Sequence, residues 1–257
     1  MTTSPSFRLD NRMVLVTGAS SGLGRHFAII LAAAGARVAL AARRLDKLEE
    51  VAAEIRAAGG TAHAVEMDVT QTASVKAGFD AAEKALGPVR VLVNNAGVPA
   101  GSAFVKTSDE EWRKILDVNL DGVFRVGREA AQRMQAHKQG GSIINIASII
   151  GLGALRTLTP YMASKAAVIH LTKGMALELA RDDIRVNALA PGYISTEFNE
   201  EFLAGDSGQR LMAKIPIRRF GKANELDGPL LLLASDAGSL MTGTVVTVDG
   251  GHLLSMG

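Results

Sequence analysis

Residues 17–24 of this 257-residue chain read Thr-Gly-Ala-Ser-Ser-Gly-Leu-Gly and join an apolar run to a helical pattern. The run, at residues 13–17, has the continuously apolar, β-rich composition of a strand that is buried on both faces. Residues 22–34 predict a helix. A glycine turn at such a junction presents backbone N–H groups and a helix N-terminus to a phosphate, although glycines also close many strand-to-helix connections that bind nothing. The stretch therefore predicts an α/β fold and indicates a nucleotide site.

The alternation of strands and helices continues along the chain. Further strands are predicted at residues 37–42, 61–66, 89–93, 142–146, 184–188 and 244–248. Helices are predicted at residues 45–58, 72–86, 109–136, 159–180 and 225–233. Because crossovers between parallel strands keep one hand, this order predicts a parallel sheet with helices on both faces. The expected fold class is a single-domain, doubly wound α/β sheet of the Rossmann type, spanning residues 1–257.

Residues 191–222 form the one long stretch without a regular pattern. A segment of that length inside a compact domain is usually functional, so we predict an irregular substrate lid there. Its apolar side chains could enclose an uncharged substrate or could only pack the lid onto the domain. These side chains are Tyr193, Ile194, Phe198, Phe202, Leu203, Leu211, Met212 and Ile215.

Composition excludes several classes of protein. The chain has no cysteine, so it contains no disulfide, no thiolate metal site and no cysteine nucleophile. Its net charge is +2 and its basic residues are scattered, so we expect no nucleic-acid partner. The five histidines show no ligand spacing, so we expect no metal. The apolar stretches are too short to cross a bilayer and residues 1–10 lack the pattern of a secretory signal, so we expect a cytoplasmic protein without a membrane partner.

The second predicted strand ends in Ala41-Ala42-Arg43-Arg44. At this place in a Rossmann sheet an acidic residue accepts a hydrogen bond from the adenosine ribose of NAD. Here no carboxylate is present to repel a 2′-phosphate, and a guanidinium can pair with one, so the residues favour NADP(H). The alternative is that both arginines are solvated charges at a helix start, where basic residues oppose the helix dipole.

A phenol and an ammonium lie four residues apart at Tyr161 and Lys165, so a helix places both on one face. A free tyrosine ionises near pH 10, and a fixed cation nearby favours the phenolate. We therefore expect Lys165 to lower the pKa of Tyr161, which could then exchange a proton with a substrate. Such pairs are also common on helix surfaces without any function.

Two further residues point to the same site. Ser148 follows the predicted strand at 142–146, and ligands of parallel sheets collect at the carboxyl ends of strands. Its hydroxyl can hydrogen-bond a reacting oxygen, or it can serve only as a turn or capping residue. Asn119 lies inside the predicted helix 109–136, where asparagine is a poor helix former. This misfit indicates a function or a kink.

Together these residues resemble the classical short-chain dehydrogenase/reductase family, in the expected order over essentially the whole chain. The glycine turn matches the family's Thr-Gly-x-x-x-Gly-x-Gly motif, and residues 94–97 match its Asn-Asn-Ala-Gly. Asp68, in Met-Asp-Val, matches the acid that contacts adenine. The segment that holds the nicotinamide carboxamide is similar to Pro191, Gly192, Ile194 and Thr196.

The resemblance implies a dinucleotide-dependent enzyme, for which the arginines after the second strand favour NADP(H), and a catalytic set made of Asn119, Ser148, Tyr161 and Lys165. Tyr161 would be the general acid in reduction and the base in oxidation, and Ser148 would polarise the substrate oxygen. Lys165 would hold the nicotinamide ribose, and the Asn119 position would bind a water that leads from the lysine to solvent. The residues that it assigns to the cofactor are Gly18, Ser20, Ser21, Gly22, Leu23, Gly24, Arg43, Arg44, Asp68, Val69, Asn95, Ala96, Gly97, Tyr161, Lys165, Pro191, Gly192, Ile194 and Thr196.

The substrate is less sharply indicated. The residues after Ser148 are apolar, with Arg156 as the exception, so we expect a small to medium, largely uncharged ketone or secondary alcohol. One alternative is a 3-oxoacyl thioester of acyl carrier protein or CoA, and another is an NADP(H)-sensing protein without catalysis. Family resemblance also implies a homotetramer or a homodimer.

Overall fold

A seven-stranded parallel sheet forms the centre of the computed structural model, which describes residues 6–99, 101–197 and 199–256. The strand order is β3-β2-β1-β4-β5-β6-β9. The strands are β1 (Met13–Thr17), β2 (Arg37–Ala42), β3 (Thr61–Glu66), β4 (Val89–Asn94), β5 (Gly141–Ile146), β6 (Ile184–Pro191) and β9 (Val245–Val248). The order reverses between β1 and β4, which opens a crevice at the carboxyl ends of these strands. Phe198, assigned above to the lid, lies outside the described residues.

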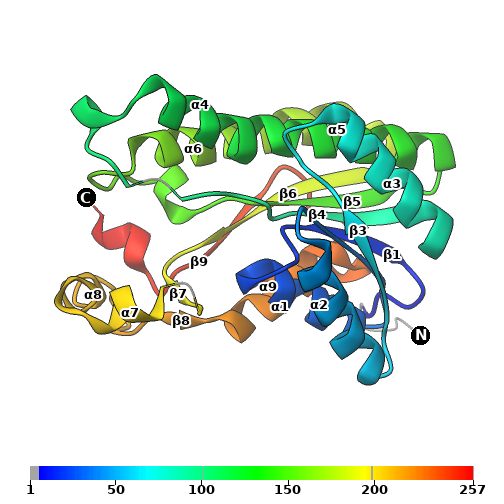
Figure 1. Ribbon diagram of the computed structural model, residues 1–257, viewed down its shortest axis with the longest axis horizontal. Coiled ribbons are helices and arrows are strands. Elements are labelled where there is room, and N and C mark those ends of the chain that lie inside the picture. The colour runs from blue at the N-terminus through cyan, green and yellow to red at the C-terminus, as the bar shows by residue number, and fades with distance from the viewer. Residues whose placement is uncertain (1–5, 100, 198, 257) are drawn as a thin grey trace.

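Helices cover both faces of the sheet, as Figure 1 shows. On one face lie α1 (Gly22–Ala33), α2 (Leu45–Ala57) and α9 (Asp227–Ala234). On the other lie α3 (Thr72–Leu86), α4 (Asp109–Leu116), α5 (Gly122–His137) and α6 (Thr159–Leu179). A cluster of buried apolar side chains fills each of the two interfaces. The doubly wound, single-domain fold is confirmed, and none of the helices formed by the described residues is long and apolar enough to cross a bilayer.

Two segments differ from the sequence prediction. The single helix expected at 109–136 is interrupted by one π-helical turn, Asp117–Asp121, which contains Asn119. Such turns widen a helix locally and often occur at functional sites. The second segment, residues 191–222, was predicted to be an irregular lid and keeps the name lid here, but it has regular structure. It contains α7 (Glu200–Ala204), α8 (Asp206–Met212) and a small parallel pair, β7 (Ile194–Ser195) with β8 (Gly221–Lys222).

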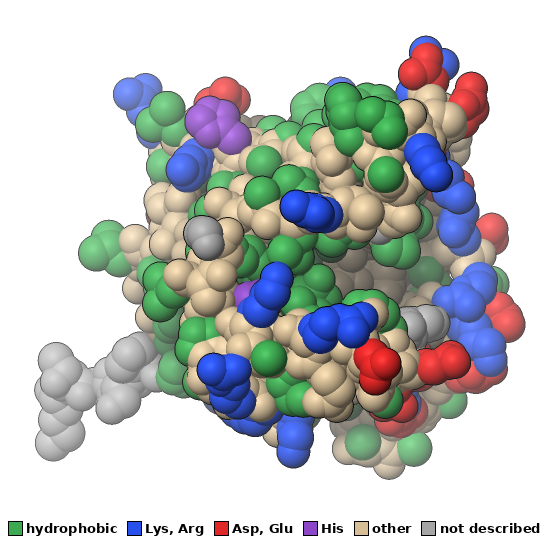
Figure 2. Space-filling model, turned by 90° about the vertical axis from the view of Figure 1, so that its left-hand side faces the viewer, with side chains coloured by type: hydrophobic (Ala, Val, Ile, Leu, Met, Phe, Trp, Pro, Cys, Tyr) green, Lys and Arg blue, Asp and Glu red, His purple; other side chains and the backbone are tan. Residues whose placement is uncertain are grey.

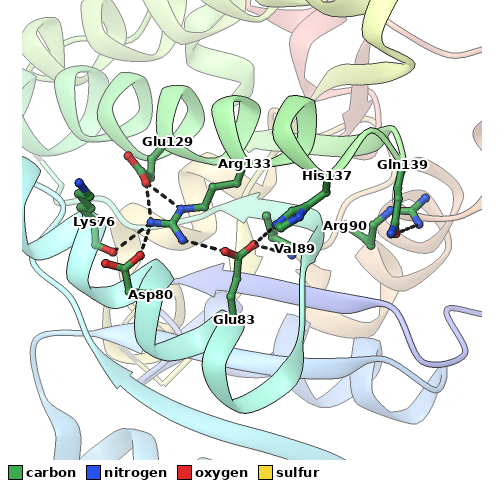
Figure 3. Close-up of polar contacts among 9 residues, drawn as sticks. All are labelled: Lys76, Asp80, Glu83, Val89, Arg90, Glu129, Arg133, His137 and Gln139. Atoms are coloured by element: carbon green, nitrogen blue, oxygen red, sulfur yellow. Dashed lines mark hydrogen bonds and ion pairs between the residues drawn. The ribbon is translucent and has the colours of Figure 1, made fainter.

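A charged cluster joins α3 to α5 (Figure 3). Arg133 of α5 donates to Glu129 and Asp80, each at 2.7 Å, and to Glu83 at 2.8 Å. His137, one turn further along α5, contacts the same Glu83 at 3.0 Å. Arg133 is only 15% exposed, so its guanidinium depends on these carboxylates for compensation of its charge. The cluster therefore fixes the helix layer that follows the π-helical turn.

Candidate functional site

Two adjoining cavities lie at the carboxyl ends of the strands. The first, of about 550 Å³, is lined by the glycine turn and is called the turn cavity here. The second, of about 1090 Å³, contains Ser148 and Tyr161 and is called the tyrosine cavity. Val98 lines the first and Pro99 lines the second, so the cavities meet at these consecutive residues. Most of the residues assigned to the cofactor line the turn cavity: Gly18, Ser20, Ser21, Gly22, Leu23, Gly24, Arg43, Arg44, Asp68, Val69, Asn95, Ala96 and Gly97.

The glycine turn is held by contacts that leave no room for side chains. A Cβ on Gly24 would collide with the carbonyl oxygen of Gly18, and Gly18 itself has a φ of +67°. Thr17 ties the turn to the end of β4, because its hydroxyl accepts from the N–H groups of Asn95 at 3.0 Å and Ala96 at 3.1 Å. The turn is thus a rigid wall of backbone that a ligand can approach closely.

The N-terminus of α1 is open to an anion. Ser21 stands at the N-cap without a side-chain capping bond, and the first turn carries no acidic residue. The Gly22 N–H instead donates to a carboxylate oxygen of Glu197, from the lid, at 3.4 Å. Uncapped N–H groups and the helix dipole favour negative charge at this place. The donor set therefore fits the pyrophosphate of a dinucleotide.

The turn cavity also contains Arg43, Arg44 and Asp68, which the sequence analysis predicts to contact the adenosine part of the cofactor. Arg44 donates to the hydroxyls of Ser20 at 3.1 Å and Ser21 at 3.3 Å, so it braces the turn, while Arg43 is exposed at the cavity wall. Burial alone would raise the pKa of Asp68. Hydrogen bonds from Thr70 and the charge of Arg43 outweigh that effect and lower it. Asp68 is thus an ionised acceptor in a positive setting.

Tyr161 and Lys165 lie close together, as their helical spacing predicted. The Lys165 ammonium is 5.5 Å from the centroid of the Tyr161 ring and donates to the Ile146 carbonyl at 2.7 Å. Burial, with a smaller contribution from Tyr193, raises the pKa of Tyr161 to about 12. Burial also lowers the pKa of Lys165 to about 8. The expected lowering of the tyrosine pKa by Lys165 is therefore wrong in this structure, because desolvation outweighs a cation that lies over the ring and is itself buried.

Ser148 lies directly after β5 and lines the tyrosine cavity with Tyr161. Its hydroxyl also accepts from the Ile150 N–H at 3.4 Å, so the residue is both a turn cap and part of the cavity wall. The turn fixes the position of the serine, and β5 together with α6 brings it to the same cavity as the phenol. The hydroxyl can therefore reach a group held in that cavity.

Asn119 holds the loop after β4. Its amide accepts from the Val98 N–H at 2.8 Å and donates to the Val98 carbonyl at 2.9 Å. It also contacts the Ser164 hydroxyl at 3.5 Å, and that hydroxyl donates to the Tyr161 carbonyl at 2.7 Å. The π-helical turn thus places Asn119 between the junction of the two cavities and the helix of Tyr161. Sequence reasoning missed Ser164, which lies inside the Tyr-x-x-x-Lys spacing.

The residues predicted to hold the nicotinamide carboxamide, Pro191, Gly192, Ile194 and Thr196, do not line the turn cavity. Gly192 lines the tyrosine cavity, and the Thr196 N–H donates to Asn199 at 2.9 Å. Pro191 is buried at the end of β6, and the Ile194 side chain is packed in the core on the α1 face. The backbone of these residues is therefore what a ligand could contact.

The structure also brings together residues that the sequence did not indicate. Lys114, Asp117 and Val118 line the turn cavity. Arg210, Lys214 and His252 line the tyrosine cavity together with Arg156. Of the apolar lid residues, Tyr193, Phe202 and Leu211 line this cavity, whereas Leu203 and Ile215 are buried. The sequence feature that could have indicated these cavity residues is the spacing of Arg210 and Lys214, which are four residues apart.

Comparisons with known proteins agree with this arrangement. The family model described as short chain dehydrogenase matches residues 12–206. A 3-oxoacyl-[acyl-carrier-protein] reductase FabG from Thermotoga maritima is 36% identical over 247 residues, covering 96% of this chain and 100% of that protein. A gluconate 5-dehydrogenase from Gluconobacter oxydans is 37% identical over 251 residues, covering 97% of this chain and 98% of that protein.

A solved structure is similar over nearly the same length. The crystal structure of a gluconate 5-dehydrogenase from Burkholderia cenocepacia in complex with NADP and tartrate matches with a TM-score of 0.92 and 38% identity. The match covers 96% of this chain and 97% of that one. The fold, the two adjoining cavities and these similarities lead to one conclusion. The chain belongs to the short-chain dehydrogenase/reductase family of oxidoreductases.

Proposed function

We propose that this protein transfers a hydride between NADP(H) and a small to medium ketone or secondary alcohol. The observation that carries the proposal is the contact between two cavities, one built for a dinucleotide and one containing Ser148 and Tyr161. When bound, the nicotinamide supplies or accepts the hydride, for which the protein has no group of its own. The chain's residues then have to hold both partners and manage one proton.

Tyr161 is the residue that exchanges the proton. With a pKa of about 12, its phenol stays protonated at neutral pH, which is the form that donates to a carbonyl oxygen during reduction. Ser148 donates a hydrogen bond to the same oxygen and stabilises the negative charge that develops there. Lys165 sits behind the tyrosine, where it can hold the ribose of the cofactor, and Asn119 positions the loop at the junction of the cavities.

NADP(H) is the cofactor, with preference over NAD(H) set at the end of β2. Arg43 is exposed at the wall of the turn cavity, and Ala42 stands where a carboxylate would repel a 2′-phosphate. The Burkholderia cenocepacia relative was solved in complex with NADP. Arg44 supports the preference indirectly, because it is bonded to the serines of the glycine turn.

A second candidate is the reduction of a 3-oxoacyl thioester of acyl carrier protein or CoA. It is favoured by the 36% identity to the Thermotoga maritima reductase. Ser148 and Tyr161 line one cavity, and Lys165 lies against the Tyr161 ring. A sensor protein without catalysis is therefore the least supported alternative.

We further propose a homotetramer or homodimer located in the cytoplasm. Phe124 on α5 and Leu177 on α6 leave 43% and 83% of their surfaces exposed, and both lie on the long helices. A subunit interface formed by these two helices would bury both side chains. Light scattering on the purified protein gives the oligomeric state.

The decisive experiment replaces the phenol and follows NADPH consumption with a panel of ketones and acetoacetyl thioesters. Tyr161→Phe should lower kcat by about a thousandfold, because one general acid is lost, while the Kd for NADPH changes little. Tyr193→Phe is the matched control, since Tyr193 lines the same cavity and is the only other tyrosine of the chain. Equal turnover in the wild type and Tyr161→Phe would contradict the assignment.

A further inference from the structure

Three cationic side chains line the tyrosine cavity beside Ser148 and Tyr161. Arg156 comes from the loop before α6, and Arg210 and Lys214 come from the lid. No aspartate or glutamate among the described residues lines this cavity. Two segments more than fifty residues apart in the chain thus deliver charge of a single sign to one site.

These cations have no carboxylate partner in the described part of the chain. Arg210 makes one neutral contact, to the Ser207 hydroxyl at 3.2 Å. The contrast within the lid is clear, because Arg219 points elsewhere and pairs with Glu225 at 2.7 Å. The acidic residues of the lid are also kept away, and Glu197 faces the glycine turn. The positive charge of the cavity is therefore not neutralised by the protein.

The cavity that these cations line opens on one face of the molecule. Figure 2 shows Lys and Arg side chains bordering a hollow on the face of the molecule that carries α7 and α8. A concave site lined by charge of one sign concentrates ligands of the opposite sign and steers their approach. An uncharged substrate would make no use of this arrangement.

The wall of the cavity adds polar groups without charge. His252 is fully buried there, and burial lowers its pKa, so its ring is neutral at neutral pH. Among the described residues neither of its ring nitrogens has a hydrogen-bond partner. The Tyr193 ring lies 5.8 Å away. Buried nitrogens without partners are rare, and because the ring is fully buried a substrate group does not reach these two in this structure.

We propose that the substrate is a small organic anion, an oxo acid or the corresponding hydroxy acid, whose charged group binds Arg156, Arg210 and Lys214. Its carbonyl or carbinol then lies at Ser148 and Tyr161. This inference rests on the proposed function and replaces the largely uncharged substrate expected from the sequence. In reduction, a hydride from NADPH goes to the carbonyl carbon and the Tyr161 proton to the carbonyl oxygen. The products are the hydroxy acid and NADP⁺, and the carboxylate is unchanged.

The test compares oxo acids, with the carbonyl at successive positions of the chain, against their methyl esters. The wild type should have a higher kcat/KM for an acid than for its ester. This acid-to-ester ratio should fall about fivefold for each of Arg156→Gln, Arg210→Gln and Lys214→Gln, and on the order of a hundredfold for the triple variant. Lys76→Gln is the control, because Lys76 is exposed on α3, lines neither cavity and should leave the ratio unchanged.

Two more measurements make the result independent of turnover. Added salt should lower kcat/KM for the acid more than for the ester, since it screens the cations. Calorimetric titration of the oxo acid into Tyr161→Phe loaded with NADP⁺ should show binding that the triple replacement weakens by a similar factor. Loss of this binding in the triple variant supports the proposal even if turnover is slow.

The outcomes separate this proposal from the proposed function. Equal kcat/KM values of the wild type for acids and for their esters overturn the anionic substrate. An unchanged acid-to-ester ratio in the triple variant does the same. Neither result contradicts hydride transfer. Reduction of acetoacetyl thioesters of CoA or acyl carrier protein in preference to every free acid also overturns it. If none of the carbonyl compounds supports oxidation of NADPH although the acid still binds, the proposed function is instead overturned.

Discussion

The turn cavity and the tyrosine cavity are neighbours, but they are built in different ways. The turn cavity is made mainly by short segments at the ends of β1 to β4, to which α4 and the π-helical turn add Lys114, Asp117 and Val118. The tyrosine cavity is assembled from the residues after β5, the start of α6, the lid and the last helical turn of the chain. The first therefore has local determinants, whereas the second depends on contacts between distant segments.

The preference of the turn cavity for NADPH over NADH should depend on a single charged side chain. Arg43→Asp should reduce the preference for NADPH over NADH on the order of a hundredfold, because it replaces a charge-assisted contact to the 2′-phosphate by repulsion. Kd values for both nucleotides, measured by fluorescence titration, give the ratio without requiring a substrate. Lys76→Asp carries the same change of charge on α3 and should leave the ratio as it is. A ratio that does not move in Arg43→Asp would remove Arg43 from the cofactor site.

The burial of Lys165, which lies behind the tyrosine cavity, should make the free energy of unfolding depend on pH. Its pKa is about 8 in the folded protein and about 10.4 in the unfolded chain, so between these values only the unfolded chain keeps the proton. Stability should therefore rise with pH in this window. Relative to Lys165→Met, the wild type should gain about 2 kcal/mol between about pH 7 and about pH 9.5, as measured by urea unfolding.

This pH range ends below the pH at which the ionisation of Tyr161 changes the free energy of unfolding. With a folded pKa of about 12 against about 10 when unfolded, Tyr161 lowers stability only as pH rises above about 10. Loss of the bond from Lys165 to Ile146 is an offset that does not change with pH. The same pH dependence in the wild type and in Lys165→Met would show that the ammonium is better solvated than its burial indicates.

The smallest expected effect links the lid to the glycine turn. Glu197 accepts from the Gly22 N–H, so its carboxylate occupies a donor that the pyrophosphate needs. Glu197→Gln should lower the Kd for NADPH about threefold, because a competing negative charge is removed. Glu200→Gln is the matched control, since Glu200 is exposed at the start of α7. Weaker binding of NADPH by Glu197→Gln would mean that this contact supports the cofactor site.

The sequence predicted the sheet, both helix layers and most residues of the turn cavity, because these depend on short spacings. Gly24 is required by its contact with the Gly18 carbonyl and Gly18 by its positive φ, and one turn of helix brings Tyr161 and Lys165 together. It did not predict that Arg210 and Lys214 meet Arg156, because that depends on how the lid folds back. Nor did it predict the pKa of Tyr161, because desolvation depends on what the whole fold packs around the ring.

The π-helical turn at Asp117–Asp121 makes the length of this segment as important as its side chains. Deleting one residue from it would restore regular α-helical winding and remove the local widening of the helix. Asn119 would then lose its two bonds to the Val98 backbone, which hold the chain where the cavities meet. Natural variants of this segment should therefore show substitutions rather than insertions or deletions.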